Sequence, residues 1–300
     1  NLSNFDLNKY GFNHVTSEKT IGLYQNNNAS QLAILTDGIY NNIDFTVNTL
    51  DNQTSLLNTL SGLNLTYFKR APSQLFDKDA RSLNQRVTKN VSNSNKDFVT
   101  ITYQVIAPPH SQLYVSIPNI SWSDDNNHSL SITVNGMTKN QVTDNTFDFF
   151  DLGYFETESM VTIKLSFPGN KAISFDNPSF YALDTQNYQI AMDTINERDS
   201  KVTTSKNKVF VDYSSKTNAS LFFTIPYDKG WTATINHKKV KIQRAQKGFM
   251  KVDVPSGKGK VVLTFIPYGL KTGSLISLLA SIIFCCYAYF IRKTTIIQKS

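Results

Sequence analysis

Apolar and polar residues alternate with a period close to two along most of the chain, in short runs that end at Gly, Pro, Asn or Asp. The runs LYVSIP at residues 113–118 and LFFTIP at 221–226 are examples. Such alternation predicts strands with one buried face, and turn residues about every 8–12 positions are typical of a β-sandwich or jelly roll. The chain is therefore predicted to be mainly β.

The pattern occurs twice, which indicates an internal duplication. LYVSIPNISW at residues 113–122 resembles LFFTIPYDKGW at 221–231, because both are apolar runs that end in Ile-Pro, a turn and a tryptophan. Further matching pairs are residues 97–105 with 208–215, 131–136 with 232–237, 147–153 with 248–257, and 161–168 with 261–267. A sheet with one apolar face must bury that face against a second sheet. We predict two tandem jelly-roll-like β-sandwiches, over residues 96–183 and 200–268.

The remaining segments are less regular. Residues 184–199 are predicted as a connecting helix with Asp184 as its N-cap. Residues 1–70 are predicted as a small mixed α/β segment, with strands at 21–26 and 31–36 and a helix at 51–62 that ends at Gly62. We expect this segment to be completed by sequence upstream of Asn1, and residues 71–95 to be a linker.

Residues 273–291 form an apolar run without a charged residue. A helix of this length spans about 28 Å, which is close to the thickness of the hydrocarbon core of a bilayer. Tyr287 and Tyr289 are predicted to anchor the helix at one interface, together with Arg292 and Lys293. Only Lys271 precedes the run closely, so the positive charge lies mainly on its C-terminal side. The positive-inside rule predicts a protein of the cell membrane, with residues 1–270 outside the cytoplasm and a cytoplasmic tail at 292–300.

Charge and composition narrow the possible chemistry. The net charge is +7, but the basic residues form no concentrated face, so we do not expect nucleic acid as a partner. The two cysteines, Cys285 and Cys286, both lie within the apolar run, where they are expected to be small apolar residues. The four histidines lack the spacing of a metal site, and no nucleophile or phosphate-loop motif is present. We predict no metal, no cofactor and no catalytic residue in this chain.

Three aromatic residues remain as candidate glycan contacts: Trp231, Tyr227 and Trp122. A sugar ring can stack on a flat indole, which supports a role in binding. Trp122 and Trp231 stand at corresponding places in the two repeats, however, and a residue that the architecture keeps in both copies is more simply a core anchor. We favour the core interpretation and keep the glycan platform as the alternative.

The C-terminal motif, IPYDKGW followed by GF, VPSGKGKVVLTFIPYG and KTG, resembles the end of the bacterial YfhO family of polytopic membrane proteins. IGLYQNNNASQLAIL at residues 21–35 and NQTSLLNTLSG at 52–62 resemble upstream motifs of that family. His237 departs from the pattern, because the family often has Gly there. The resemblance implies that the chain is the extracytoplasmic C-terminal region of such a protein, together with its last membrane helix.

The YfhO family resembles glycosyltransferases of the GT-C type. This resemblance implies transfer of sugar from a polyprenyl-phosphate donor to lipoteichoic or wall teichoic acid in Gram-positive bacteria. The partners would then be the lipid bilayer, the polyprenyl-phosphate sugar and the teichoic acid polymer. The catalytic carboxylate of that class is expected upstream of Asn1, so no catalytic residue is carried over. The alternative is a non-catalytic carbohydrate-binding or adhesive module anchored by one transmembrane helix.

Overall fold

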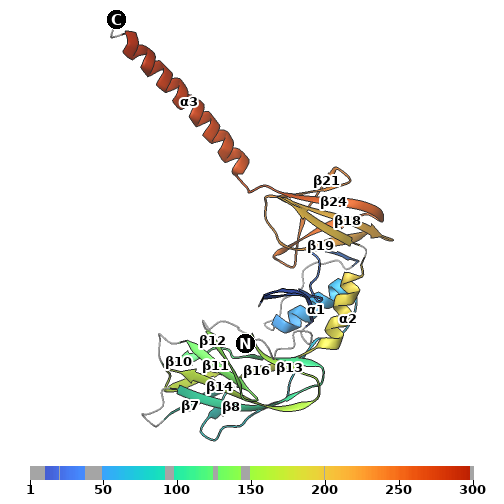
Figure 1. The fold of residues 1–300 in the computed structure, drawn as a ribbon, viewed down its shortest axis with the longest axis vertical. Helices are drawn as coiled ribbons and strands as arrows, with labels where there is room; N and C mark the ends of the chain where they lie inside the picture. Colours follow the sequence, from blue (N-terminus) through green and yellow to red (C-terminus); the bar gives the residue numbers. More distant parts are fainter. Residues whose placement is uncertain are drawn as a thin grey trace. The chain divides into compact units, whose positions relative to one another are not determined.

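The structure is a computed structural model that describes residues 11–19, 21–37, 49–91, 98–123, 128–142, 149–198 and 200–297. The chain forms two compact units. Unit 1 takes in residues 1–29 and 45–194, and unit 2 takes in residues 30–44 and 195–300. Both units are built from antiparallel strands, and three helices accompany them in the described part of the chain (Figure 1).

Unit 1 is a β-sandwich with an additional small sheet. A five-stranded sheet has the order β12-β11-β14-β8-β5, with β12 at Met137–Val142, β11 at Ser129–Val134, β14 at Ser159–Pro168, β8 at Phe98–Ala107 and β5 at Ser73–Leu75. A four-stranded sheet has the order β13-β9-β16-β4, with β13 at Phe149–Phe155, β9 at Ser111–Ser116, β16 at Ser179–Asp184 and β4 at Phe68–Arg70. The additional sheet has the order β10-β15-β7-β6, with β10 at Ser121–Trp122, β15 at Ala172–Asp176, β7 at Arg86–Asn90 and β6 at Arg81–Leu83.

The core of unit 1 lies between the first two of these sheets and includes buried residues of the additional sheet, such as Val87 and Phe175. Every second residue of β8 is buried, and the inward residues of β14 include Ile163 and Leu165. They belong to one apolar cluster with Leu113, Val115 and Phe180 of the four-stranded sheet. The period-two pattern of the sequence therefore does produce two sheets packed face to face.

Unit 2 repeats this arrangement. Its five-stranded sheet has the order β17-β18-β24-β20-β21, with β17 at Ser200–Ser205, β18 at Lys208–Ser215, β24 at Gly257–Phe265, β20 at Trp231–Ile235 and β21 at Lys238–Val240. Its four-stranded sheet has the order β22-β23-β19-β3, with β22 at Gln243–Ala245, β23 at Phe249–Val254, β19 at Ala219–Pro226 and β3 at Ala33–Thr36.

The strand orders confirm the duplication that the sequence predicts. The series β12-β11-β14-β8 in unit 1 corresponds to β21-β20-β24-β18 in unit 2, and the pair β13-β9 corresponds to β23-β19. Leu113 and Leu221 are fully buried at matching places in β9 and β19. The hairpins β11–β12 and β20–β21 both turn through two residues with positive φ, which are Asn135 and Gly136 in one unit and Asn236 and His237 in the other.

Two sequence predictions need correction. Residues 71–95 are not a linker, because they contain β5, β6 and β7, and these strands pair with β8 and β15 of unit 1. Residues 1–70 do not form a single segment, because their strands are divided between the two units. Strand β3 pairs with β19 and completes the sheet of unit 2, whereas β4 pairs with β16 in unit 1.

A third correction concerns the two tryptophans, which do not occupy equivalent places. Trp122 lies in β10, which pairs with β15 in the additional sheet. Trp231 begins β20, which pairs with β24 and corresponds to β11. The reason is the length of the connection after the Ile-Pro motif: in unit 2 it is a tight turn, while in unit 1 it is long enough to form an additional strand.

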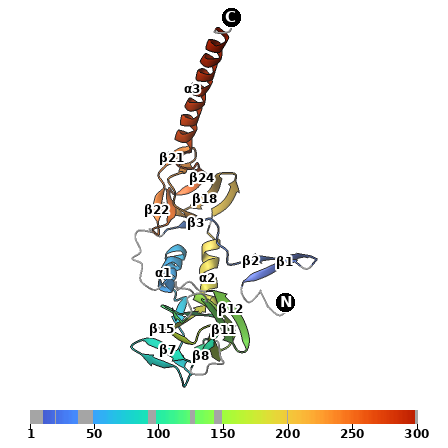
Figure 2. The same ribbon diagram turned by 90° about the vertical axis from the view of Figure 1, so that its left-hand side faces the viewer.

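The helices agree with the sequence predictions. Helix α1 covers Thr49–Ser61 and stops at Gly62, which has a φ of 74° and whose N–H donates to the carbonyl of Asn58 at 2.8 Å. Helix α2 covers Thr185–Asn196, and Asp184 caps it by accepting the N–H of Asn187 at 3.0 Å. Both views show α1 and α2 side by side (Figures 1 and 2).

Two further elements complete the described chain. The strands β1 at Phe12–Glu18 and β2 at Ile21–Asn26 form a hairpin whose residues are almost all exposed, and Figure 2 shows it as a separate two-stranded ribbon. Helix α3 covers Leu270–Ile297. Its first 20 residues, Leu270–Tyr289, include Lys271 but are on average apolar enough, and long enough, to cross a membrane, and none of the described side chains in this span is buried.

Candidate functional site

Trp231 lies at the edge of the unit 2 core. Its side chain is half-buried, and its ring centroid lies 4.9 Å from that of Phe265. The preceding Gly230 is held close to the next strand, since its carbonyl accepts the N–H of Ile266 at 3.0 Å. The N–H of Gly230 donates to the carboxylate of Asp228 at 2.6 Å. The IPYDKGW motif therefore builds a tight turn that brings Trp231 onto the core.

The other two predicted aromatics also have neighbours on their rings. The guanidinium of Arg244 lies 4.8 Å from the ring centroid of Tyr227. The indole of Trp122 stacks on His128 at 5.1 Å and meets the edge of Phe167 at 5.7 Å. Trp122 belongs to unit 1 and the other two to unit 2, so the structure does not show the three as one site. A glycan contact at any of them stays a prediction.

A cleft of about 580 Å³ opens in unit 1, on the outer face of its four-stranded sheet. We call it the unit 1 cleft. Its lining residues come from the sheet, from both helices of the unit and from the base of the β1–β2 hairpin: Gly11, Phe12, Asn26, Asn28, Gln53, Phe68, Gln112, Tyr114, Asp151, Leu183, Thr185, Tyr188 and Gln189. The sequence analysis did not identify this site.

The strand register explains the floor of the unit 1 cleft. Tyr114 of β9 is paired with Asp151 of β13, and two residues away Gln112 is paired with Leu183 of β16. Leu183 is paired in turn with Phe68 of β4. Side chains two residues apart, or directly opposite on paired strands, share one face of a sheet. The intervening residues of β9 point into the core, so these five form the opposite, outer face.

Local hydrogen bonds hold the walls in place. The side chain of Asn58 in α1 donates to the carbonyl of Leu65 at 2.8 Å and accepts both the N–H of Leu65 at 3.0 Å and the hydroxyl of Tyr67 at 2.9 Å. Asn187 of α2 donates from its side chain to the carbonyl of Thr66 at 3.0 Å. These bonds fasten the segment before β4 to both helices, and thereby fix Gln53, Tyr188 and Gln189 beside the sheet.

The described lining of the unit 1 cleft contains a carboxylate but no cationic residue. Asp151 accepts hydrogen bonds from the N–H of Gly153 at 2.9 Å and from the side-chain amide of the buried residue Gln112. Lys139 lies just outside the lining, with its Nζ 3.3 Å from the second oxygen of Asp151. Burial raises the pKa of Tyr188, so its phenol keeps its proton and can act as a hydrogen-bond donor. The arrangement combines aromatic rings with amide, hydroxyl and carboxylate groups.

The corresponding sheet of unit 2 carries a different polar cluster. Asp253 accepts hydrogen bonds from Ser220 at 2.7 Å, from Gln243 at 2.6 Å and from the buried Lys251 at 3.2 Å. Partial burial alone would raise the pKa of Asp253, but these hydrogen bonds and the charge of Lys251 outweigh it, and the net pKa is lowered. Because the buried charge is already paired, we interpret this cluster as structural.

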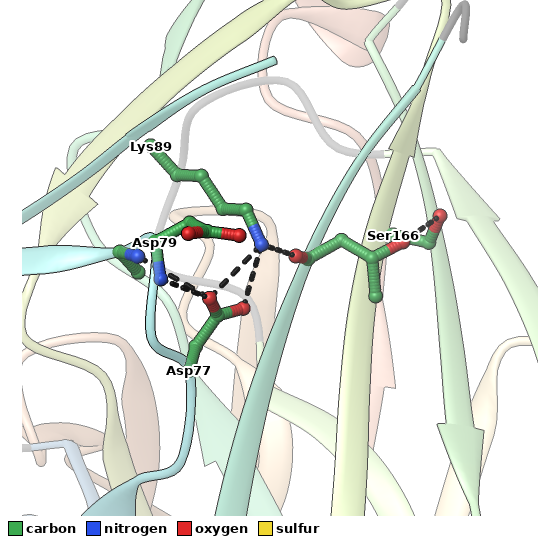
Figure 3. Close-up of polar contacts among 6 residues, drawn as sticks. Asp77, Asp79, Lys89 and Ser166 are labelled. Carbon is green, nitrogen blue, oxygen red and sulfur yellow. Dashed lines mark hydrogen bonds and ion pairs between the residues drawn. The ribbon is translucent and has the colours of Figure 1, made fainter. Parts of the chain in front are cut away.

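A second paired charge lies inside unit 1 (Figure 3). The ammonium of Lys89 lies 2.8 Å from one oxygen of Asp77 and also donates to the carbonyl of Thr100 at 2.8 Å. Asp77 accepts the N–H groups of Asp79 and Ala80 as well. Burial would raise the pKa of Asp77, but these bonds and the charge of Lys89 lower it on balance. Each group of the pair has its partners within the fold, which indicates a structural role.

The described residues contain no group of three or more His, Cys, Asp or Glu side chains that could hold a metal ion. In the predicted membrane helix, Tyr287 and Tyr289 are 62% and 64% exposed, like the other described side chains of the span, and their anchoring role stays a prediction. Arg292 and Lys293 fall within α3, but their side chains lie outside the described ones. Their anchoring role stays a prediction.

The family profile described as "Bacterial membrane protein YfhO" matches residues 1–277 of this chain. The chain belongs to the YfhO family of bacterial membrane proteins. A relative named "Uncharacterized protein YfhO" from Bacillus subtilis (strain 168) is 26% identical over 141 residues, which is 44% of this chain and 16% of that protein. The chain therefore matches only a small part of the length of its YfhO relative.

Solved structures show only a weak likeness to the chain. A cycloisomaltooligosaccharide glucanotransferase from Paenibacillus sp. is 8% identical, with a TM-score of 0.27, over 70% of this chain and 50% of its own. A family two carbohydrate esterase from Cellvibrio japonicus is 12% identical, with a TM-score of 0.22, over 38% of this chain and 33% of its own. Scores this low carry no argument about function.

Proposed function

We propose that this YfhO-family chain is the extracytoplasmic C-terminal region, with the last membrane helix, of a polytopic membrane glycosyltransferase. The enzyme would transfer a sugar from a polyprenyl-phosphate donor to a cell-surface polymer such as lipoteichoic or wall teichoic acid. The observation that carries the proposal is the family match over residues 1–277, which ends within the apolar helix α3. The resemblance of the family to GT-C enzymes supplies the reaction class.

The proposed orientation rests on the distribution of positive charge around the candidate span. Lys271 stands at the start of the candidate span, and Arg292, Lys293 and Lys299 follow it. Under the positive-inside rule, both sandwich units then face the outside of the cell, where a polyprenyl-linked donor and a wall polymer are present. Catalytic groups are expected upstream of Asn1 in the parent protein, and the sandwich units are proposed to hold the acceptor polymer.

The larger part of unit 1, residues 45–194, lies between the two parts of unit 2, so most of unit 1 can be removed without interrupting a strand of unit 2. In the full-length parent protein, residues 49–194 would be replaced by a short Gly/Ser linker, which keeps β3 and the remaining strands of unit 2. The sugar content of the purified wall and lipid-linked polymers would then be measured by composition analysis, with membrane levels of the protein checked by immunoblot. We expect the sugar to be lost. Normal decoration at normal protein levels would refute a required role for unit 1.

A strain that lacks the whole gene distinguishes the proposed function from the alternative one. An adhesive or carbohydrate-binding module would leave the polymers fully decorated when the whole gene is deleted, while the cells lose attachment to a glycan-coated surface. A glycosyltransferase instead predicts undecorated polymers in that deletion strain.

A further inference from the structure

We propose that the unit 1 cleft binds a neutral saccharide, one or two sugar rings in length, rather than a phosphate-bearing backbone. The inference deepens the proposed function, on which its biological role rests, because it names the chemical group that the extracytoplasmic region would recognise. A volume of about 580 Å³ is within the usual range of small-molecule sites.

The aromatic residues of the cleft support binding of a sugar ring. Four rings line the described part of the cleft, and they come from four separate segments: Phe12 from the hairpin, Phe68 from β4, Tyr114 from β9 and Tyr188 from α2. The centroids of Phe68 and Tyr114 lie 6.5 Å apart with their planes tilted by 59°. The two rings place adjacent but tilted apolar surfaces on the floor of the cleft. The C–H faces of a pyranose pack against such a floor, while its hydroxyl groups point to the sides.

The polar residues fit the edges of a sugar ring. Gln53 of α1 and Gln189 of α2 line the walls, and Asn26 lies at the base of the hairpin. An amide side chain both donates and accepts, as a sugar hydroxyl does, so each amide can bond a hydroxyl in either direction. The carboxylate of Asp151 adds acceptor oxygens, and the protonated Tyr188 adds a donor.

The charges of the cleft argue against a phosphate ligand. Among the described residues, Asp151 is the one acidic lining residue, and no described Lys or Arg lines the cleft. Phosphate sites generally use arginine, lysine or a free helix N-terminus. Helix α2 does begin at the cleft, but the carboxylate of Asp184 already accepts the N–H of Asn187 there at 3.0 Å, and Lys69 lies 4.0 Å from the same carboxylate. Lys139 and Lys69 are thus already paired with Asp151 and Asp184, so neither ammonium group is left unpaired for a phosphate, whereas a neutral sugar needs no such group.

Binding can be measured on the 300-residue chain itself. The chain would be held in micelles of a detergent with neither a sugar nor a phosphate headgroup, such as dodecyl octaethylene glycol ether. Saturation-transfer NMR would be recorded with maltose, gentiobiose and N-acetylglucosamine as neutral probes, and with glycerol 1-phosphate and inorganic phosphate as anionic ones. We expect transfer to at least one neutral probe, with unchanged affinity in 0.5 M NaCl and no competition by inorganic phosphate.

Three variants locate the site. Phe68→Ala removes part of the floor, Asp151→Asn removes the charge, and Gln53→Ala removes an amide from the exposed face of a helix, where alanine favours the helix. Phe68→Ala should weaken binding by about tenfold or more. Asp151→Asn and Gln53→Ala should each weaken it by a few-fold. The matched control is Phe76→Ala, because Phe76 is 60% exposed and lies outside the lining. Melting curves show which variants remain folded, and Gln53→Ala keeps the test valid if the floor variant unfolds.

The proposal fails if no neutral probe shows transfer, if phosphate competes with the sugar, or if the folded cleft variants bind as tightly as the Phe76→Ala control. These outcomes are independent of the decoration assay. Loss of sugar from the polymers without saccharide binding by the chain would retain the proposed function and overturn this inference. Saccharide binding without any change in decoration would retain this inference and overturn the proposed function.

Discussion

Gly230 offers a sharp test of the turn that positions Trp231. A Cβ atom added at Gly230 would lie 2.4 Å from the carbonyl oxygen of Ile266 and 2.8 Å from a ring carbon of Phe265. Contacts below about 3 Å to backbone atoms do not occur in folded proteins without movement of the chain. The carbonyl cannot move freely, because the N–H of Ile266 is bonded to Gly230 at 3.0 Å.

The expected effect of Gly230→Ala is a loss of about 1–3 kcal/mol from the free energy of unfolding of unit 2, as for other overpacked sites. For a domain of about 100 residues, each kcal/mol lowers the melting temperature by about 4–8 °C. The chain has only two tryptophans, one in each unit, so fluorescence can be made specific. In a Trp122→Phe background, Trp231 alone reports the unfolding of unit 2 in urea.

The matched control is Gly248→Ala in the same unit. A Cβ at Gly248 would meet nothing closer than the carbonyl oxygen of Gln246 at 3.9 Å. The free energy of unfolding of this variant should therefore lie within about 1 kcal/mol of that of the parent chain. If Gly230→Ala unfolds at the same urea concentration as Gly248→Ala, the steric explanation of the IPYDKGW turn is wrong.

Three further predictions concern stability. Tyr103→Phe should stabilise unit 1 by about 1–3 kcal/mol in urea, because its buried hydroxyl has no hydrogen-bond partner among the described residues; a destabilised variant would reveal a partner for that hydroxyl. His237→Gly should raise the melting temperature of unit 2 by an amount equivalent to about 1–2 kcal/mol, because His237 has a φ of 69° in a turn where the equivalent residue is Gly136, and an unchanged melting temperature would contradict this. The pKa values of Asp77 and Asp253 are lowered in the fold, so their ionised carboxylates stabilise it. This stabilisation is complete above the pKa of the unfolded carboxyl, near 4, and is lost as pH falls through the lower folded values. Asp77→Asn should therefore flatten the acid dependence of unfolding for unit 1 only, and Asp253→Asn for unit 2 only.

The sequence was a good guide wherever the deciding interactions are local or repeated. Long alternating runs predicted β8, β14 and β24, and the two Ile-Pro motifs predicted the matching strands β9 and β19. The caps at Asp184 and Gly62 predicted the limits of two helices, because each cap bonds residues within one turn of itself. The apolar run predicted α3, which begins three residues earlier than the run itself.

Prediction failed where pairing is distant or strands are short. Strands β4, β5 and β6 have three residues each, too few to show a period. The sequence of β3 does predict a strand, but nothing local indicates that its partner is β19, far along the chain. The tryptophans were aligned on a shared motif although the connections that follow differ in length.

The unit 1 cleft was not predictable for a similar reason. Its lining comes from the hairpin, two helices and four strands, and each segment supplies only one to four residues. One local signal exists, which is the alternation of Gln112 and Tyr114 with buried Leu113 and Val115 in β9. That pattern shows a polar, aromatic outer face, but it does not show which other residues the fold will bring beside it.

The origin of β3 has a consequence for biogenesis. Its four residues are all buried in unit 2, yet they leave the ribosome long before the strand they pair with, β19. During synthesis and export this apolar segment would have to remain exposed while the intervening polypeptide folds. Folding of residues 45–194 into unit 1 would then lower the entropic cost of pairing β3 with β19, because a folded insert leaves a much shorter flexible loop between the two strands. Variants that delay the first domain should therefore also delay maturation of the second and increase its exposure to chaperones and proteases.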